Sequence, residues 1–307
     1  MQKTVKVFAV ILIIAFVSAV LVFGESVFAT SPSRLTCLIA GFDDAAENTD
    51  MLSVVDFDFS ANIIRVIQIP RDTYFNFGKS QNKINQIFPS LRAEGASKQR
   101  ALKSLTETVG EALAISIDGY AGITTRALCD AVTSLGGIYV DTEKDMTLYA
   151  VDGAPILQLK KGENLLSADQ ALTLVRYRSG YVRGDLDRLD AQKLFIHGLY
   201  KTIVRNGGYK TLAVTLLSLD GITTNISLAQ VVPRIGRVPN ISGMTVEVNT
   251  LAGAAVQNDR GIWYYSLNRR GAIEMLSGFS TFNAEAFDKK RSFLKDDDKN
   301  FSNIYNS

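Results

Sequence analysis

The sequence has little of several residue types on which common enzyme chemistries depend. Its 307 residues include one histidine, two cysteines and six prolines. Closely spaced cysteines and a zinc-binding helix motif are missing, and so are the G-x-S-x-G and Walker phosphate-loop motifs. His197 lies in an amphipathic helical pattern without a nearby acid or nucleophile, so we expect a packing or surface role for it.

An excess of charge of one sign is also missing. Lysine and arginine together number 33 and aspartate and glutamate 31, which leaves a net charge of +2. This balance gives no general attraction to nucleic acid, and we expect no nucleic-acid partner. Hydrophobic residues make up 47% of the chain, enough for a large core. Because strands mix with helices and no repeat or linker splits residues 31–280, the sequence predicts one α/β domain around a central sheet.

One long hydrophobic run is present, at the N-terminus. It extends from Val7 to Phe23, and at about 1.5 Å per residue it spans roughly 26 Å, close to the thickness of a bilayer core. Two lysines precede the run and Glu25 follows it, which predicts a cytoplasmic N-terminus and an exterior remainder. Cleavage after Ala29 is the alternative to a permanent anchor.

These signals divide the chain into three parts. Residues 1–29 form a cytoplasmic tip and transmembrane signal-anchor, residues 30–286 an extracellular domain, and residues 287–307 a flexible tail of mixed charge. An oxidising exterior would permit a disulfide between Cys37 and Cys129. The two cysteines lie in separate apolar patterns, one strand-like and one helical, which favours two separately buried thiols.

Three short segments rich in β-branched residues follow, at 35–42, 51–58 and 62–70. The link between the last two is short enough for an antiparallel hairpin. A turn centred on Ser60 places position 50 opposite position 70, so that Arg71 lies beside Asp50. If the first strand also pairs antiparallel with the second, Asp43 reaches the same edge. The sequence therefore predicts a metal and phosphate site there, although Asp43 and Asp50 can also be interpreted as simple turn and strand-edge residues.

A second cluster contains arginine but no lysine. It consists of Arg176, Arg178, Arg183 and Arg188. Planar guanidinium groups bind phosphate oxygens through paired hydrogen bonds, and Gln192 lies one helical turn beyond Arg188 on the same face. Two interpretations remain open: an anion-binding site, or a solvated basic loop that pairs with the neighbouring aspartates.

Further elements follow from periodicity and turn residues. The sequence predicts helices at 97–113, 125–135, from 168 onward after a capping box at Ser167, at 187–205, within 210–240 and from 272 as the last helix. It predicts extended segments at 116–122, 138–140, 146–149 and 156–159, and a closing strand pair at 245–249 and 261–267.

In their order, these pieces resemble the LytR–CpsA–Psr family of cell-wall enzymes over residues 35–205. The matching motifs are Gly41-Phe42-Asp43, Thr49-Asp50, Ile69-Pro70-Arg71-Asp72-Thr73, Lys83-Ile84-Asn85, Leu135-Gly136-Gly137-Ile138, Gly162, Ser167 to Leu172, Val175-Arg176-Tyr177-Arg178, Gly184-Asp185 and Arg188 with Gln192. The resemblance implies a mixed, largely antiparallel sheet flanked by helices on both faces. It also implies a single-pass membrane protein with an extracellular transferase domain.

Such a transferase moves a glycopolymer of the teichoic acid or capsular type from an undecaprenyl pyrophosphate or phosphate carrier to peptidoglycan. By resemblance, Asp43 and Asp50 hold Mg²⁺ or Mn²⁺, and one of them would take the proton of the acceptor hydroxyl. The resemblance assigns the pyrophosphate oxygens to Arg71, Arg176, Arg178 and Arg188, with support from Gln192. The implied partners are the lipid-linked polymer, peptidoglycan and membrane lipid, with a hydrophobic tunnel for the polyprenyl tail.

Three positions differ from the usual family residues. Ala191 and Asp44-Ala45 stand where arginines are common, and Gln68 replaces a serine. The first two changes predict less positive charge at the site. Two other functions are compatible with the same residues: hydrolysis of the polyprenyl pyrophosphate without transfer, and non-catalytic binding of polyprenyl phosphates or anionic glycans in a regulatory role.

Overall fold

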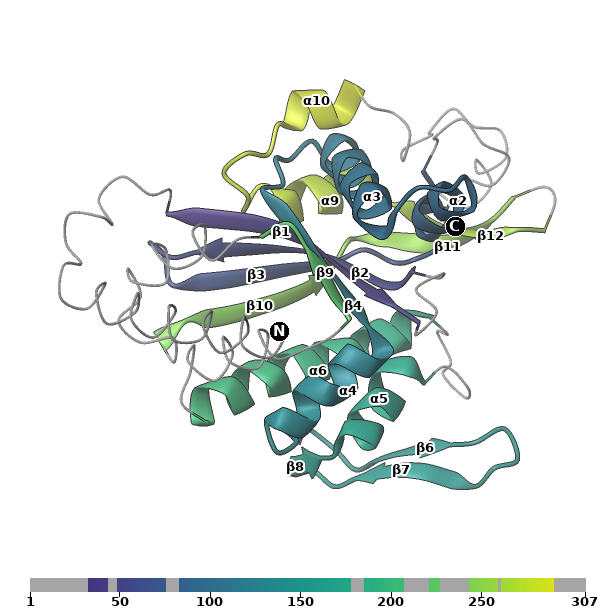
Figure 1. The fold of residues 1–307 in the computed structure, drawn as a ribbon, viewed down its shortest axis with the longest axis vertical. Coiled ribbons are helices and arrows are strands. Elements are labelled where there is room, and N and C mark those ends of the chain that lie inside the picture. Colours follow the sequence, from purple (N-terminus) through teal and green to yellow (C-terminus); the bar gives the residue numbers. More distant parts are fainter. Residues whose placement is uncertain are drawn as a thin grey trace, which may run out of the picture.

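A six-stranded mixed β-sheet with the strand order β10-β3-β2-β1-β4-β9 forms the centre of the molecule (Figure 1). Its strands are β1 (Arg34–Phe42), β2 (Thr49–Asp58), β3 (Ile63–Gln68), β4 (Gly119–Thr124), β9 (Ile222–Thr224) and β10 (Thr245–Thr250). The pairs β1–β2, β2–β3 and β4–β9 are antiparallel, whereas β1–β4 and β3–β10 are parallel. The predicted α/β fold with a central mixed sheet is confirmed.

The computed structural model describes residues 33–43, 49–75, 83–177, 185–206, 221–226, 243–258 and 261–289. The predicted signal-anchor, most of the predicted 210–240 helical region and residues 290–307 of the predicted charged tail lie outside these residues. No helix in the described part is both long enough and apolar enough to cross a membrane.

Helices cover both faces of the sheet (Figure 1). On one side lie α2 (Ile87–Ala93), which follows the short 3₁₀ turn η1 (Ile84–Gln86), α3 (Lys98–Leu113), α9 (Arg269–Leu276) and α10 (Ala284–Lys289). On the other side lie α4 (Thr125–Ser134), α5 (Ala168–Arg176) and α6 (Asp185–Arg205). Because side chains alternate along a strand, β1 directs Leu38 into the core beneath α3 and Cys37 into the core that includes Tyr200 of α6.

Three two-stranded sheets surround the central one. They pair β5 (Ile138–Thr142) with β8 (Gly162–Leu166), β6 (Met146–Tyr149) with β7 (Pro155–Leu159), and β11 (Gly253–Gln257) with β12 (Trp263–Leu267). The first two pairs share a second apolar cluster with α4, α5 and α6, in which Leu174 and Phe195 are buried. Ala191 also packs in this cluster.

The helices begin where the sequence predicts because their first turns are capped. The Ser97 hydroxyl accepts a hydrogen bond from the Arg100 amide, and the Thr124 hydroxyl does the same for Ala127. Ser167 and Gln170 form both hydrogen bonds of a capping box at α5. Such caps contribute about 1 kcal/mol each. The predicted helices at 97–113, 125–135, 168 onward and 187–205 are therefore confirmed to within two residues.

Several expectations for the C-terminal third are wrong. The predicted closing pair does not form, because β10 pairs parallel with β3 and β12 pairs instead with β11. The helix α9 is not the last one. It is followed by α10, which crosses the predicted domain end at residue 286, buries Phe287 and pairs Asp288 with Arg269. Both cysteines are thiols, with Cys37 buried in β1 and Cys129 half-buried in α4.

Candidate functional site

The β2–β3 hairpin brings Asp50 and Arg71 together at one end of the central sheet. Its ladder pairs Ser53 with Gln68, so the turn centres between positions 60 and 61 rather than on position 60. Continued along the same register, position 50 lies opposite position 71. The Arg71 Nη1 atom is 3.4 Å from the Asp50 Oδ1 atom.

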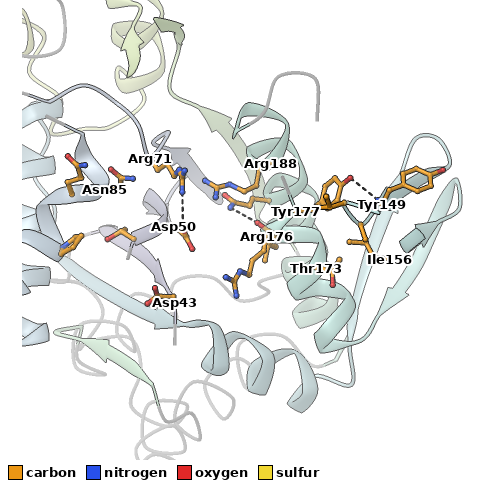
Figure 2. Close-up of a pocket in the computed structure, with 17 residues that line it drawn as sticks. Asp43, Asp50, Arg71, Asn85, Tyr149, Ile156, Thr173, Arg176, Tyr177 and Arg188 are labelled. Atoms are coloured by element: carbon orange, nitrogen blue, oxygen red, sulfur yellow. Dashed lines mark hydrogen bonds and ion pairs between the residues drawn. The ribbon is translucent and has the colours of Figure 1, made fainter. Parts of the chain in front are cut away.

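A tight turn places Arg71 at this end of the sheet. The Pro70 carbonyl accepts hydrogen bonds from the Thr73 amide at 2.9 Å and from the Thr73 hydroxyl at 2.5 Å. Thr73 is fully buried, which anchors the turn in the core. The neighbouring Asp72 pairs with Lys83 at 3.0 Å. The Asp72 carboxylate is thus neutralised mainly by Lys83, which leaves the Arg71 guanidinium directed towards Asp50 (Figure 2).

A cavity of about 900 Å³ opens beside this turn. Six of the seven predicted site residues line it: Asp43, Asp50, Arg71, Arg176, Arg188 and Gln192 (Figure 2). The seventh, Arg178, lies outside the described residues. Asp43 follows the last residue of β1, whose carbonyl accepts a hydrogen bond from the Thr125 hydroxyl at 3.1 Å. Residues far apart in the sequence therefore share one cavity, because one end of strands β1, β2 and β3 meets the ends of α5 and α6.

The arginines differ in their exposure. The Arg188 residue is 2% exposed, whereas Arg176 at the end of α5 is open to solvent. Burying a guanidinium is costly unless anionic or hydrogen-bonding groups surround it. With Arg71 half-exposed at the sheet edge, the cavity carries positive charge from its buried wall to its mouth. This arrangement suits a ligand with several anionic oxygens.

Gln192 makes a contact that sequence reasoning did not anticipate. Its Nε2 atom donates to the Val175 carbonyl at 3.3 Å, next to Arg176. Its Oε1 atom is buried without a hydrogen-bond partner among the described residues. The amide nitrogen carries a second N–H donor, which can serve a phosphate oxygen in the cavity that this residue lines. In this arrangement Gln192 fastens α6 to α5.

The carboxylates supply donors of the type that magnesium prefers. Asp43 and Asp50 line the same cavity, and the buried Asn85 Oδ1 atom on its wall has no hydrogen-bond partner in the described part. The described residues contain no group of three or more histidine, cysteine, aspartate or glutamate side chains that could hold a metal. Two carboxylates completed by water and phosphate oxygens fit Mg²⁺, which seldom uses an all-protein cage.

The cavity has an apolar rim that the sequence did not predict as part of the site. Tyr149, Val151 and Ile156 of the β6–β7 hairpin line it and are exposed (Figure 2). The Tyr177 hydroxyl accepts a hydrogen bond from the Tyr149 amide at 3.2 Å, which connects the hairpin to the chain just after Arg176. The sequence predicted both strands, but a local pattern carries no signal for where a hairpin folds back.

Comparison with known proteins gives the family. A model of the LytR_cpsA_psr family matches residues 20–278, and the chain belongs to this family. TagV of Bacillus subtilis (strain 168), named polyisoprenyl-teichoic acid–peptidoglycan teichoic acid transferase, is 31% identical over 172 residues, which are 53% of this chain and 42% of TagV. TagU of Bacillus mycoides (strain KBAB4), with the same descriptive name, is 26% identical over 238 residues, which are 75% of this chain and 73% of TagU.

The fold is also shared with solved structures. The crystal structure of B. subtilis TagV superposes with a TM-score of 0.63 at 22% identity, covering 83% of this chain and 98% of that chain. The chain matches less than half the length of the full TagV sequence. The chain therefore shares both its family and its fold with these proteins.

Proposed function

We propose that this protein transfers an anionic glycopolymer, of the teichoic acid or capsular polysaccharide type, from an undecaprenyl pyrophosphate or phosphate carrier to peptidoglycan. The observation that carries the proposal is the cavity in which Arg71, Arg176 and Arg188 meet Asp43 and Asp50. The descriptive names of TagV and TagU, which state transfer of teichoic acid to peptidoglycan, support the same reaction class.

The arginines would bind and orient the carrier phosphates. Phosphoryl transfer depends mainly on positioning and on neutralising charge, so donors fixed around the phosphate oxygens supply much of the catalysis. Arg188, held in the buried wall, would bind the oxygens deepest in the cavity. Arg71, just after β3, and Arg176, at the end of α5, would bind the remaining oxygens. Arg178, two residues beyond Arg176, is proposed for the same role on its sequence position alone.

Magnesium is part of the proposal. Asp43 and Asp50 would hold Mg²⁺ (or Mn²⁺), which when bound supplies charge neutralisation at the pyrophosphate. The Arg71–Asp50 ion pair, with both side chains partly exposed, can open when phosphate oxygens take over Arg71. The Asp50 carboxylate then becomes available at the place where the phosphates sit.

The proposed reaction moves the polymer and its phosphate from the carrier to a hydroxyl of peptidoglycan. On a pyrophosphate carrier, the acceptor hydroxyl of peptidoglycan attacks the phosphorus that carries the polymer, and the bond from this phosphorus to the oxygen that bridges the two phosphorus atoms breaks. Polyprenyl phosphate leaves, and the new phosphodiester joins polymer and peptidoglycan. The hydroxyl proton passes to a carboxylate at the site, for which Asp43 and Asp50 are the candidates. We further propose a single-pass membrane location with the domain outside the cell, since peptidoglycan, the implied acceptor, lies there.

One reconstitution separates the candidate reactions. The full-length protein is incubated with Mg²⁺, a lipid-linked polymer and peptidoglycan fragments, and the products are separated by mass. We expect a polymer–peptidoglycan conjugate and free polyprenyl phosphate in equal amounts. Free polymer without conjugate would instead establish a hydrolase, and binding without turnover would establish a regulatory binder. When Arg71→Ala is tested in this reaction, the variant Arg126→Ala, on the exposed surface of α4, is the control for a general loss of positive charge.

A further inference from the structure

Gln68, the last residue of β3, connects three elements through its amide and its backbone. It is fully buried. Its Nε2 atom donates to the Leu189 carbonyl of α6 at 3.1 Å, and its Oε1 atom accepts from the Thr250 hydroxyl of β10 at 3.0 Å. Its own carbonyl accepts from the Leu251 amide at 2.9 Å. Both ends of the side-chain amide are therefore used, which fixes its orientation.

The position of Gln68 in the strand explains this reach. Its neighbours Ile67 and Ile69 are buried in the core beneath α3, and side chains alternate along a strand. Gln68 therefore points to the opposite face, where α6 packs. The carbonyl that it meets belongs to Leu189, the residue directly after Arg188. A hydrogen bond at this point holds the part of α6 that carries the buried guanidinium.

A second amide continues the connection from α6 to α5. Gln192, one turn beyond Arg188, donates to the Val175 carbonyl beside Arg176. The chain of contacts thus runs from β3 through Gln68 to α6, and from α6 through Gln192 to α5. Arg71 and Asp50 lie at the same end of the β2–β3 hairpin as Gln68. Two buried side-chain amides therefore link the end of β3 to α6 and α5, the two helices that supply arginines to the cavity.

We propose that Gln68 is a positioning residue, which acts through Leu189 and α6 to set the place of Arg188, and through Gln192 the place of Arg176, relative to Arg71. The inference deepens the proposed function and rests on it for the identity of the ligand. Bound geometry that loosens by about 1 Å can cost up to roughly 100-fold in activity. Loss of the Gln68 hydrogen bonds to Leu189 and Thr250 should therefore weaken binding, in addition to the stability lost by leaving buried polar groups unsatisfied.

The test compares Gln68→Met, which keeps the size and loses both side-chain hydrogen bonds, with Thr36→Val. The control removes another buried hydrogen bond of the sheet, from Thr36 to Asp56 at 3.0 Å, near the end of β1 remote from Asp43. Affinity for geranylgeranyl pyrophosphate with Mg²⁺ is measured by calorimetry on the full-length protein. We expect a roughly tenfold loss for Gln68→Met and none for Thr36→Val. Equal affinity of Gln68→Met and the unaltered protein overturns the inference.

A double-variant cycle excludes a purely structural effect. If Gln68 acts through Arg188, Gln68→Met should weaken binding much less in an Arg188→Met background than in the unaltered protein. A full, additive penalty in that background contradicts the positioning role.

Amide hydrogen exchange keeps the inference testable without a ligand. Over residues 185–192 we expect faster exchange in Gln68→Met and unchanged exchange in Thr36→Val. Unchanged exchange in Gln68→Met overturns the inference even if the protein binds no polyprenyl pyrophosphate. Absence of binding by the unaltered protein, together with faster exchange, overturns the proposed substrate but keeps the connection between Gln68 and α6.

Discussion

The Nη1 atom of Arg71 lies 3.4 Å from the Oδ1 atom of Asp50, across the end of the β2–β3 hairpin. The side chains are 27% and 32% exposed, and ion pairs of this kind contribute about 0–1 kcal/mol to stability. The pair is therefore a weak stabiliser of the fold. Its placement on the cavity wall gives it a different significance, because a phosphate that binds Arg71 would release the carboxylate of Asp50.

The first prediction concerns Arg71. Its replacement by alanine should lower polymer transfer by roughly 100-fold, because one fixed donor to the phosphate oxygens is lost. The melting temperature should change by only a few degrees, since the ion pair is half-exposed. Arg71→Lys should recover part of the activity, as an ammonium keeps the charge but not the paired hydrogen bonds. Retained transfer by Arg71→Ala would remove this residue from the site.

The second prediction concerns the metal. Chelation with EDTA should abolish binding of geranylgeranyl pyrophosphate, and added Mg²⁺ should restore it. Asp43→Asn and Asp50→Asn should each raise the Mg²⁺ concentration needed for half-maximal binding by roughly tenfold or more, because an amide is a weaker ligand than a carboxylate. Asp130→Asn, on the exposed surface of α4, should leave that concentration unchanged. If EDTA has no effect on binding, the metal assignment is wrong.

The third prediction concerns Arg188, whose guanidinium is buried in the cavity wall. Arg188→Met should weaken pyrophosphate binding by roughly tenfold or more, because a fixed donor to the phosphate oxygens is lost. The free energy of unfolding should fall as well, because removing one partner of a buried ionic or hydrogen-bonded contact leaves the other partner uncompensated. Calorimetry and urea unfolding measure the two quantities on one preparation. A large loss of stability with normal binding would instead identify a structural arginine.

Local patterns predicted much of this arrangement. The hairpin register follows from a short turn between two β-branched segments, and it alone brings Arg71 to Asp50. The caps at Ser97, Thr124 and Ser167 mark helix starts in the sequence because each satisfies backbone amides within a few residues. These features depend on neighbours along the chain, which a single sequence displays.

Contacts between distant segments were not predictable in the same way. The parallel pairing of β10 with β3 joins residues far apart in the sequence, and the hydrogen bond from Gln68 to Leu189 spans 121 positions. A glutamine inside an apolar strand pattern shows only that some polar partner exists. Likewise, the Tyr149 side of the cavity follows from where the β6–β7 hairpin folds back. The three-dimensional packing of the helices decides these contacts.

The last prediction concerns two aspartates of β2 that titrate in opposite directions. Burial raises the pKa of Asp56, although Arg34 at 3.1 Å and the Thr36 hydroxyl oppose this effect. Burial also acts to raise the pKa of Asp58, but hydrogen bonds from the Ala61 amide and from Ser60 outweigh it, so the pKa is lowered.

The signs for unfolding follow from proton linkage. Above the ordinary value of 3.8, folded Asp56 holds its proton more tightly than unfolded Asp56, so its contribution to the free energy of unfolding falls as the pH rises through this window. Asp58 contributes stability that is present above 3.8 and lost as the pH falls towards its lower folded pKa. Urea unfolding from pH 2.5 to 6 compares the unaltered protein with Asp56→Asn and Asp58→Asn. Relative to Asp56→Asn, the free energy of unfolding of the unaltered protein should fall with rising pH. Relative to Asp58→Asn, it should increase with rising pH. Parallel curves for the two variants would contradict these opposite shifts.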